Sequence, residues 1–197
     1  MEPLEHSSLA ADPIDQFRRW FERAEREVPL PEAMTLATAD AGGAPNARMV
    51  LLKGVGPDGF RFYTNYESAK GDELEANPRA ALVIYWRELD RQVRVRGTVS
   101  KLPHADSDAY FATRPRDSRI AAAVSPQSRP VERDRLDEAF ERAAAERGEQ
   151  VPRPPHWGGY LLEPTEIEFW QGREGRMHDR FRYSRDDGGW RIERLAP

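Results

Sequence analysis

The spacing of apolar positions changes along the chain, which indicates helices in some places and strands in others. Residues 12–28 follow the helical period, because their apolar side chains recur every three or four positions and share one face. Asp12 and Pro13 suit the N-cap and N1 positions, and Pro29 cannot continue a helix. The sequence therefore predicts a helix over 12–28 that packs on a core, preceded by a flexible tail at 1–11.

Strand signals dominate most of the remaining chain. In "RQVRVRG", for example, valines alternate with arginines, which gives a strand one buried face and one wet face. The predicted strands are 33–40, 46–55, 60–65, 80–88, 91–102, 158–172, 180–185 and 190–196, and the further predicted helices are 65–76, 103–115, 116–125 and 131–148. We expect a single α+β domain over 12–197, mainly β with flanking helices, whose six to eight antiparallel strands form a small barrel.

The composition excludes several classes of protein. Of the 197 residues, 39% are hydrophobic, mean hydropathy is −0.80, and no apolar run approaches the roughly 20 residues that span a bilayer. The absence of cysteine excludes disulfides and thiol nucleophiles. The net charge of −4 argues against nucleic acid as a partner, and the N-terminal residues lack the apolar region of a signal peptide. We expect a cytoplasmic protein with neither a membrane nor a nucleic-acid partner.

Common catalytic motifs are also absent. The sequence has no Walker loop, no GxGxxG, no nucleophile elbow and no HExxH, and its four histidines are scattered, so no metal site is expected. The basic residues are more informative, because only Lys53, Lys70 and Lys101 are lysines among the 30 lysine and arginine residues. Where an arginine-rich chain retains lysine, the compact ammonium group is of interest.

Two stretches in the first half of the chain are suited to anion binding. In "FYTNYESAKG" a strand end meets a helix start, and Thr64, Ser68 and Lys70 lie where a helix has free N–H groups and the positive end of its dipole. In "RMVLLK" two cations, Arg48 and Lys53, bound an otherwise apolar strand. An ordinary capped helix and a strand with charged ends also explain these patterns, so the sequence leaves both explanations open.

A third stretch, "YFATRPRDS", combines three polar groups. Tyr110 and Arg114 are four residues apart and hence neighbours on a helix face, and the proline that follows turns the chain toward Ser118. A phenol, a guanidinium and a hydroxyl can converge on a phosphate in this arrangement. A solvated helix end remains the alternative.

A fourth stretch, "GRMHDRF", lies near the C-terminus. Arg176, His178 and Arg180 are spaced by two, which predicts that they share one face of a strand. Three such groups repel one another unless something anionic or aromatic lies among them. Gln92, in "RQV", means little when taken alone.

Taken together and in order, these motifs closely resemble one family, the pyridoxamine (pyridoxine) 5′-phosphate oxidases. The motifs are "RMVLLK", "FYTN", "SAKG", "RQV", "RPRDS", "VSPQS", "WGGY", "EFWQG" and "RMHDRF", and the resemblance runs from about residue 34 to residue 197. It implies an FMN-binding split barrel and a homodimer whose two active sites are each built from both subunits. One departure is Ala69, where relatives commonly have a second cation beside Lys70, so one contact to the FMN phosphate is missing.

The resemblance also assigns roles to residues. Those that would hold FMN are Arg48, Met49, Val50, Leu51, Leu52, Lys53, Tyr63, Thr64, Lys70, Gln92, Gln127, Ser128, Trp170 and Arg180. Those that would bind the substrate are Lys53, Tyr110, Arg114, Ser118, Arg176 and His178, the last two being catalytic and lying against its ring. Arg48 and Lys70 would neutralise the FMN phosphate, while Gln127 and Ser128 would come from the other subunit.

The activity that the resemblance implies is oxidation of pyridoxamine or pyridoxine 5′-phosphate by O₂ to pyridoxal 5′-phosphate, with release of H₂O₂, in vitamin B6 biosynthesis and salvage. Ammonia is released when the substrate is the amine. Two alternatives remain. One is a related flavin oxidase acting on another aromatic acid, such as a phenazine precursor, and the other is a non-catalytic protein that binds FMN or pyridoxal phosphate.

Overall fold

The first helix begins where the sequence predicts it. In the computed structural model, which describes residues 3–197, α1 spans Pro13–Glu27. The Asp12 carboxylate caps this helix by accepting the backbone N–H of Ile14 at 2.7 Å. The apolar face of α1 lies on the sheet, where Phe17 is fully buried. Its ring meets that of Phe60 edge-to-face at 5.0 Å, so truncating Phe17 to alanine would cost about 3–5 kcal/mol.

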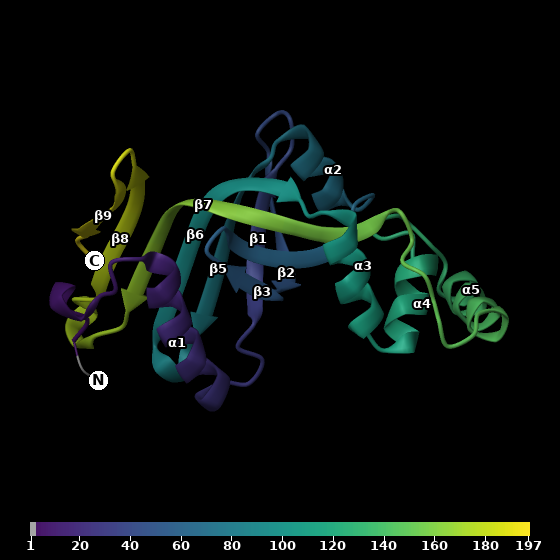
Figure 1. Ribbon diagram of the computed structural model, residues 1–197, viewed down its shortest axis with the longest axis horizontal. Helices are drawn as coiled ribbons and strands as arrows, with labels where there is room; N and C mark the ends of the chain where they lie inside the picture. The colour runs from purple at the N-terminus through teal and green to yellow at the C-terminus, as the bar shows by residue number, and fades with distance from the viewer. Residues whose placement is uncertain (1–2) are drawn as a thin grey trace.

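Nine strands and four further helices follow α1 (Figure 1). The helices are α2 (Ala69–Ala76), α3 (His104–Thr113), α4 (Arg116–Val124) and α5 (Arg133–Glu146), with 3₁₀ turns η1 (His6–Ser8), η2 (Arg87–Leu89) and η3 (Glu174–Arg176). The strands are β1 (Ala33–Ala39), β2 (Pro45–Leu51), β3 (Gly54–Gly56), β4 (Gly59–Asn65), β5 (Arg79–Trp86), β6 (Arg91–Lys101), β7 (Trp157–Gln171), β8 (Asp179–Asp186) and β9 (Gly189–Arg194).

All nine strands pair antiparallel in one sheet. The order is β2-β1-β5-β6-β7-β4-β3, with β8 paired to β7 and β9 to β8. The count exceeds the predicted six to eight because the predicted strand 46–55 is divided at Leu52 and Lys53 into β2 and β3. These two strands lie at opposite ends of the order, so a two-residue link between them requires the sheet to curl. The predicted split barrel is confirmed as a curled, half-closed sheet.

Strand β7 connects the two ends of the molecule. Its residues 157–162 pair with β4, its residues 166–171 pair with β8, and β6 runs along the opposite side of both halves. At about 3.3 Å per residue, the strand from Trp157 to Trp170 is about 40 Å long. Accordingly α3, α4 and α5 lie at one end of the molecule, and β8 and β9 at the other (Figure 1).

The N-terminal segment packs against the C-terminal hairpin where the sequence predicts a flexible tail. Leu4 and Ala10 are only 6% and 8% exposed. The hydroxyl of Tyr183 donates to the Ala10 carbonyl at 2.8 Å, and Arg194 donates to the Leu4 carbonyl at 3.2 Å. Two residues of the predicted tail, 1 and 2, lie outside the described residues. The segment has few apolar side chains, so its hydrophobic pattern does not indicate this docking.

The helices at the other end form a small unit of their own. Helices α4 and α5 pack around Ile120, which is fully buried, with Ala143 beside it. Arg116, in the first turn of α4, donates to the Ala144 carbonyl at 2.7 Å and so satisfies one of the free carbonyls at the end of α5. None of the helices in residues 3–197 is long and apolar enough to cross a membrane.

Candidate active site

A hollow of about 680 Å³ lies where α3 and α4 meet β2 and β4. This volume is within the range of roughly 300–1,000 Å³ that is typical of small-ligand sites. The predicted site residues that line the hollow are Met49, Val50, Leu51, Lys53, Tyr63, Thr64, Lys70, Tyr110, Arg114, Ser118 and Gln127. Further residues that the sequence did not single out, among them Asn65 and Trp157, complete the lining. The fold thus gathers three of the four predicted anion-binding stretches into one place.

Lys70, the second residue of α2, is a buried cation in this hollow. The residue is only 7% exposed. Its Nζ donates to Ser68 Oγ at 3.0 Å and to Gln127 Oε1 at 3.1 Å. Burial, together with the nearby positive charge of Arg48, lowers the pKa of Lys70 to about 8, and the negative charge of Glu73 opposes only part of this shift. Both hydrogen-bond partners are neutral, and within residues 3–197 no carboxylate oxygen lies within 4.0 Å of Nζ. The site therefore favours an anionic ligand.

Arg114, the C-cap residue of α3, is the second cation. Its guanidinium lies 4.6 Å from the centroid of the Trp157 ring, and among the described residues its buried Nη1 has no hydrogen-bond partner. Burial lowers the pKa of Arg114, although an arginine remains protonated at neutral pH. Leaving a buried N–H without an acceptor costs about 1–3 kcal/mol, which a ligand oxygen would recover.

Aromatic rings form one wall of the hollow. The rings of Tyr63 and Tyr110 stack at 3.9 Å, and the Tyr63 ring lies 5.7 Å from that of Trp157. Burial raises the pKa of both phenols, so at neutral pH they remain protonated and can donate hydrogen bonds. Trp157 begins the "WGGY" motif, so the one signal that marked it in the sequence was the family resemblance.

Successive side chains of β2 and of the residue after it alternate between the two faces of the sheet. Met49 and Leu51 face outward, 62% and 39% exposed, while Val50 and Leu52 are 9% and 5% exposed. Leu52 belongs to the hydrophobic core and its side chain does not line the hollow, contrary to the predicted role against the flavin. Lys53 follows β2 and lines the hollow, with Nζ 3.8 Å from Glu32 Oε1.

Arg48 already has a counter-ion. Its Nη2 lies 2.7 Å from Glu73 Oε2, and its Nη1 donates to the Thr38 hydroxyl. Burial would raise the pKa of Glu73, but hydrogen bonds from Thr38, Asn46 and Arg48 outweigh it and lower that pKa. The sequence did not indicate Glu73, because it is one of several acidic residues on a short helix. Its carboxylate offsets part of the charge that Arg48 was expected to offer a phosphate.

A second group of predicted residues lies at the other end of β7. Gln92, Trp170 and Arg180 are directly paired across β6, β7 and β8 and so form one row on the sheet. Arg180 Nε donates to Glu168 Oε1 at 2.8 Å, and the side chain of Glu168 is 6% exposed. None of these residues lines the hollow.

The two predicted catalytic residues lie in the turn that precedes β8. The predicted strand face of Arg176, His178 and Arg180 is wrong, because β8 begins at Asp179 and Arg176 belongs to η3. Gly175 and Arg176 both have positive φ, 65° and 60°, a conformation that is strained for arginine. The His178 ring lies 4.6 Å from the ring of Trp170. His178 therefore lies against an aromatic ring rather than on a paired strand.

Within one chain the two groups are far apart. Trp157 borders the hollow at the start of β7 and Trp170 lies near its end, and Figure 1 shows α3 and α4 at the opposite end of the molecule from β8. A single chain therefore does not bring His178 to Arg114. Gln127 was predicted to reach the site from the other subunit. The structure instead places it in the hollow of its own chain, where it accepts a hydrogen bond from Lys70. Ser128 follows it with φ of 69° and does not line the hollow.

Solved structures with this architecture define a class of fold. A pyridoxamine 5′-phosphate oxidase-related, FMN binding protein from Nostoc punctiforme matches with a TM-score of 0.79 and 20% identity, over 96% of this chain and 100% of that one. PhzG from Burkholderia lata, in complex with tetrahydrophenazine-1-carboxylic acid, matches with a TM-score of 0.94 and 32% identity, over 100% and 98% of the two chains. The fold is the split barrel that these proteins share.

Two family models and many curated relatives narrow the class. The model described as pyridoxamine 5′-phosphate oxidase matches residues 21–170, and that of the pyridoxine 5′-phosphate oxidase C-terminal dimerisation region matches residues 157–197. Pyridoxine/pyridoxamine 5′-phosphate oxidases from Bordetella petrii and Salinibacter ruber are 56% and 54% identical to this chain, over 98% of it and 93% of each relative. The chain belongs to the pyridoxamine 5′-phosphate oxidase family, as its motifs predict. The dimerisation-region match supports a homodimer.

The residues of the hollow fit FMN. A flat ring system needs apolar and aromatic surface, which Met49, Leu51 and the stacked tyrosines provide. Its phosphate needs a cation and polar donors, and Lys70 lies in the hollow among neutral hydrogen-bond partners, with Thr64 in the same lining. Both requirements are met within one chain.

Proposed function

We propose that this protein uses FMN and O₂ to oxidise pyridoxamine 5′-phosphate or pyridoxine 5′-phosphate to pyridoxal 5′-phosphate. The other products are H₂O₂ and, from the amine, ammonia. The observation that carries the proposal is that one hollow contains two cations without a carboxylate partner in the described chain: Lys70, which is buried, and Arg114, which is half-buried and has one buried N–H without an acceptor. The names of relatives that are 54–56% identical support the same reaction.

Two cations suit two phosphates. Lys70, with Thr64, would hold the phosphate of FMN, and Arg114, with Tyr110, would hold that of the substrate. Lys53 and Ser118 would complete the substrate clamp. Each hydrogen bond to a charged group contributes about 1.5–3 kcal/mol, so the clamp would fix the substrate mainly through its phosphate. A substrate held in this way reacts in one orientation, which accounts for much of the expected rate enhancement.

FMN, when bound, supplies the oxidising chemistry by accepting two electrons from C4′ of the substrate. The protein binds and orients the two rings and keeps water from them. The stacked Tyr63 and Tyr110 rings form a rigid wall beside the substrate clamp. The apolar side chains of Met49 and Leu51 would line the flavin.

A second subunit would complete the site. The partner subunit's Arg176 and the partner subunit's His178 would lie against the substrate ring, and the partner subunit's Trp170 and the partner subunit's Arg180 would reach the flavin. The distance between the two groups along β7 supports this arrangement, because one chain cannot use both groups in one place. The match to a dimerisation-region model over 157–197 supports it as well.

Oxidation of a phenazine precursor is the second candidate. It is favoured by the close structural similarity to PhzG, which was solved with tetrahydrophenazine-1-carboxylic acid. Such a substrate has a carboxylate but no phosphate. The half-buried guanidinium of Arg114, whose buried Nη1 has no acceptor among the described residues, lies in the same hollow as Tyr110 and Ser118 and favours a phosphorylated substrate. A third candidate, a non-catalytic flavin-binding protein, has no use for Arg176 and His178.

The test is a direct assay of the purified protein. It is supplied with FMN, O₂ and, in turn, pyridoxamine 5′-phosphate, pyridoxine 5′-phosphate, unphosphorylated pyridoxine and a reduced phenazine-1-carboxylic acid. We expect aldehyde and peroxide in equal amounts from the two phosphates and little from the other two. Turnover of the phenazine alone would support the second candidate, and flavin binding without turnover would support the third.

A further inference from the structure

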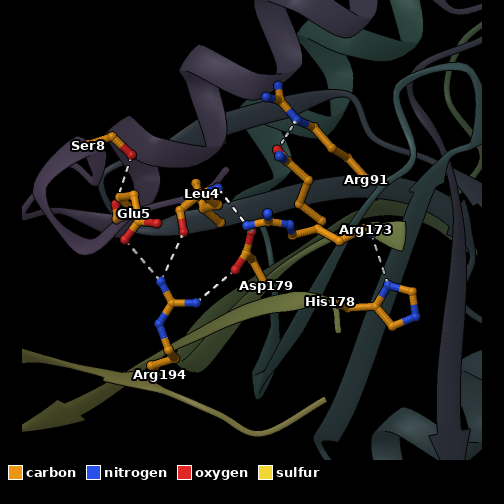
Figure 2. Close-up of polar contacts among 9 residues, drawn as sticks. Leu4, Glu5, Ser8, Arg91, Arg173, His178, Asp179 and Arg194 are labelled. Carbon is orange, nitrogen blue, oxygen red and sulfur yellow. Dashed lines mark hydrogen bonds and ion pairs between the residues drawn. The ribbon is translucent and has the colours of Figure 1, made fainter. Parts of the chain in front are cut away.

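One buried carboxylate holds together the turn between β7 and β8. The side chain of Asp179 is 5% exposed. Its Oδ1 accepts from Arg194 Nη1 at 2.7 Å, and its Oδ2 accepts from Arg173 Nη1 at 3.3 Å and from the backbone N–H of Leu4 at 3.1 Å (Figure 2). The N-terminal segment, the turn and β9 thus meet at a single side chain.

The carboxylate is kept ionised by these contacts. Burial alone would raise the pKa of Asp179, but hydrogen bonds from Arg194, Leu4 and Arg173 outweigh it and lower that pKa. Leu4, itself 6% exposed, covers this network, and Arg194 also donates to the Leu4 carbonyl at 3.2 Å. Exclusion of water strengthens each of these hydrogen bonds.

His178 is linked to this carboxylate through Arg173. The backbone N–H of Arg173 donates to Nδ1 of His178 at 3.2 Å, as Figure 2 shows, and the guanidinium of the same arginine is held by Asp179. A ring nitrogen that accepts a hydrogen bond carries no proton, so the neutral imidazole has its proton on Nε2. The Trp170 ring, 4.6 Å away and tilted by 42°, limits rotation of the imidazole.

We propose that Asp179 is a positioning residue, which acts through Arg173 to hold His178 in the tautomer that is protonated at Nε2. The imidazole then presents an N–H donor, rather than an acceptor, to the ring of the substrate. The identity of that substrate rests on the proposed function, whereas the tautomer does not. The role differs from that of Glu168, which contacts Arg180 directly and has no link to the histidine.

The tautomer can be observed by nitrogen NMR of the FMN-loaded protein labelled with ¹⁵N-histidine. His178→Gln identifies the resonances of His178 among the four histidines. In the wild-type protein we expect the neutral imidazole to carry its proton on Nε2 and none on Nδ1. Asp179→Asn keeps the size of the side chain and an acceptor for Leu4 but removes the charge that holds Arg173, so both tautomers should be populated.

Kinetics provide the second measurement. In Asp179→Asn we expect kcat for pyridoxine 5′-phosphate to fall about tenfold, the scale of effect seen when the support of a functional histidine is removed. KM should change less than about twofold, because the phosphate clamp at Arg114 is untouched. FMN content should be unchanged. A general loss of folding would instead lower FMN content and activity together.

Three further variants keep the test decisive. Arg173→Ala removes a guanidinium that is 42% exposed but retains the backbone N–H, so it should fold and should act in the same direction as Asp179→Asn. Arg173→Lys should recover part of the loss. Glu193→Gln is the matched control. It removes a carboxylate from the same hairpin, but this carboxylate pairs with Arg182 and not with a residue of the turn.

The outcomes separate this inference from the proposed function. Protonation of His178 at Nδ1 in the wild-type protein would overturn the inference. So would a wild-type tautomer and kcat in both Asp179→Asn and Arg173→Ala. If the tautomer depends on Asp179 but no B6 phosphate is oxidised, the positioning role stands and the proposed function fails.

Discussion

The two ends of the molecule compensate charge in opposite ways. In the hollow, Lys70 is buried and its hydrogen-bond partners are neutral. At the other end, on β7 and at the start of β8, the buried charged groups are the carboxylates Glu168 and Asp179, and each lies between two arginines. Glu168 is 3.2 Å from Arg94 and 2.8 Å from Arg180. Asp179 is 3.3 Å from Arg173 and 2.7 Å from Arg194.

This difference separates a binding site from a framework. A buried cation without a carboxylate is costly unless a ligand brings the anion, whereas a buried carboxylate between arginines is complete within the protein. We therefore expect substitutions in the hollow to change the affinity for phosphates, and substitutions at the hairpin to change turnover.

The largest effect should follow from Arg114→Ala. Removing one charge-assisted contact, worth about 1.5–3 kcal/mol, should raise KM for the phosphorylated substrate by about tenfold to a hundredfold. FMN content should hardly change, because Lys70 lies elsewhere in the hollow. Steady-state kinetics and the flavin absorbance of the purified variant measure the two quantities. Loss of FMN with an unchanged KM would mean that the two phosphate sites are exchanged.

Mixed dimers test whether the two ends act together. Arg176→Leu should lower kcat/KM by at least about tenfold without loss of FMN, because its side chain would contact the substrate of the partner subunit. When Arg114→Ala and Arg176→Leu proteins are unfolded together and refolded, about half of the dimers combine both chains, and each has one intact site. Activity at low substrate should recover to about a quarter of that of the wild-type protein. No recovery, with mixed dimers present, would place both groups in sites of a single chain.

The pH dependence of FMN binding should report on Lys70. Without an anion its pKa is about 8, so the ammonium loses its proton as the pH rises through that value. Bound phosphate favours the protonated form, and the affinity for FMN should therefore fall roughly eightfold between about pH 7.5 and pH 9. The unfolded chain retains this proton up to a higher pH, so the stability of the FMN-free protein should rise over the same interval. Lys70→Arg, which stays charged, should remove the pH dependence, and an equally steep decline in that variant would contradict the assignment.

The smallest effect is expected at Ala69, the exposed first residue of α2. Ala69→Arg adds a cation beside Lys70, and because exposed pairs contribute only about 0–1 kcal/mol, FMN should bind about twofold to tenfold more tightly at most. Turnover at saturating FMN should stay the same. Titration by quenching of flavin fluorescence at low and high salt measures the gain, with Ala69→Gln as an uncharged control. If the arginine variant binds no more tightly even at low salt, another group already contacts that phosphate.

Local patterns in the sequence determined much of this protein. The Asp12-Pro13 pair placed the start of α1, and the alternation of valine and arginine in "RQVRVRG" placed Val93 and Val95 on a buried face. These features follow from periods and caps that involve only near neighbours in the chain. The order of the motifs was enough to identify the family, because each motif keeps its residue types whatever surrounds it.

Only the tertiary structure decided which charges are paired and which residues meet. Glu73 neutralises Arg48 from 25 positions away, and Leu4 binds Asp179 from 175 positions away, so no local period contains either contact. The length of β7 separates His178 from the hollow. The fold also brings Gln127 within hydrogen-bond distance of Lys70 in the same chain. A hydrophobic pattern specifies which face of an element is buried, but the partner of a buried charge depends on the path of the whole chain.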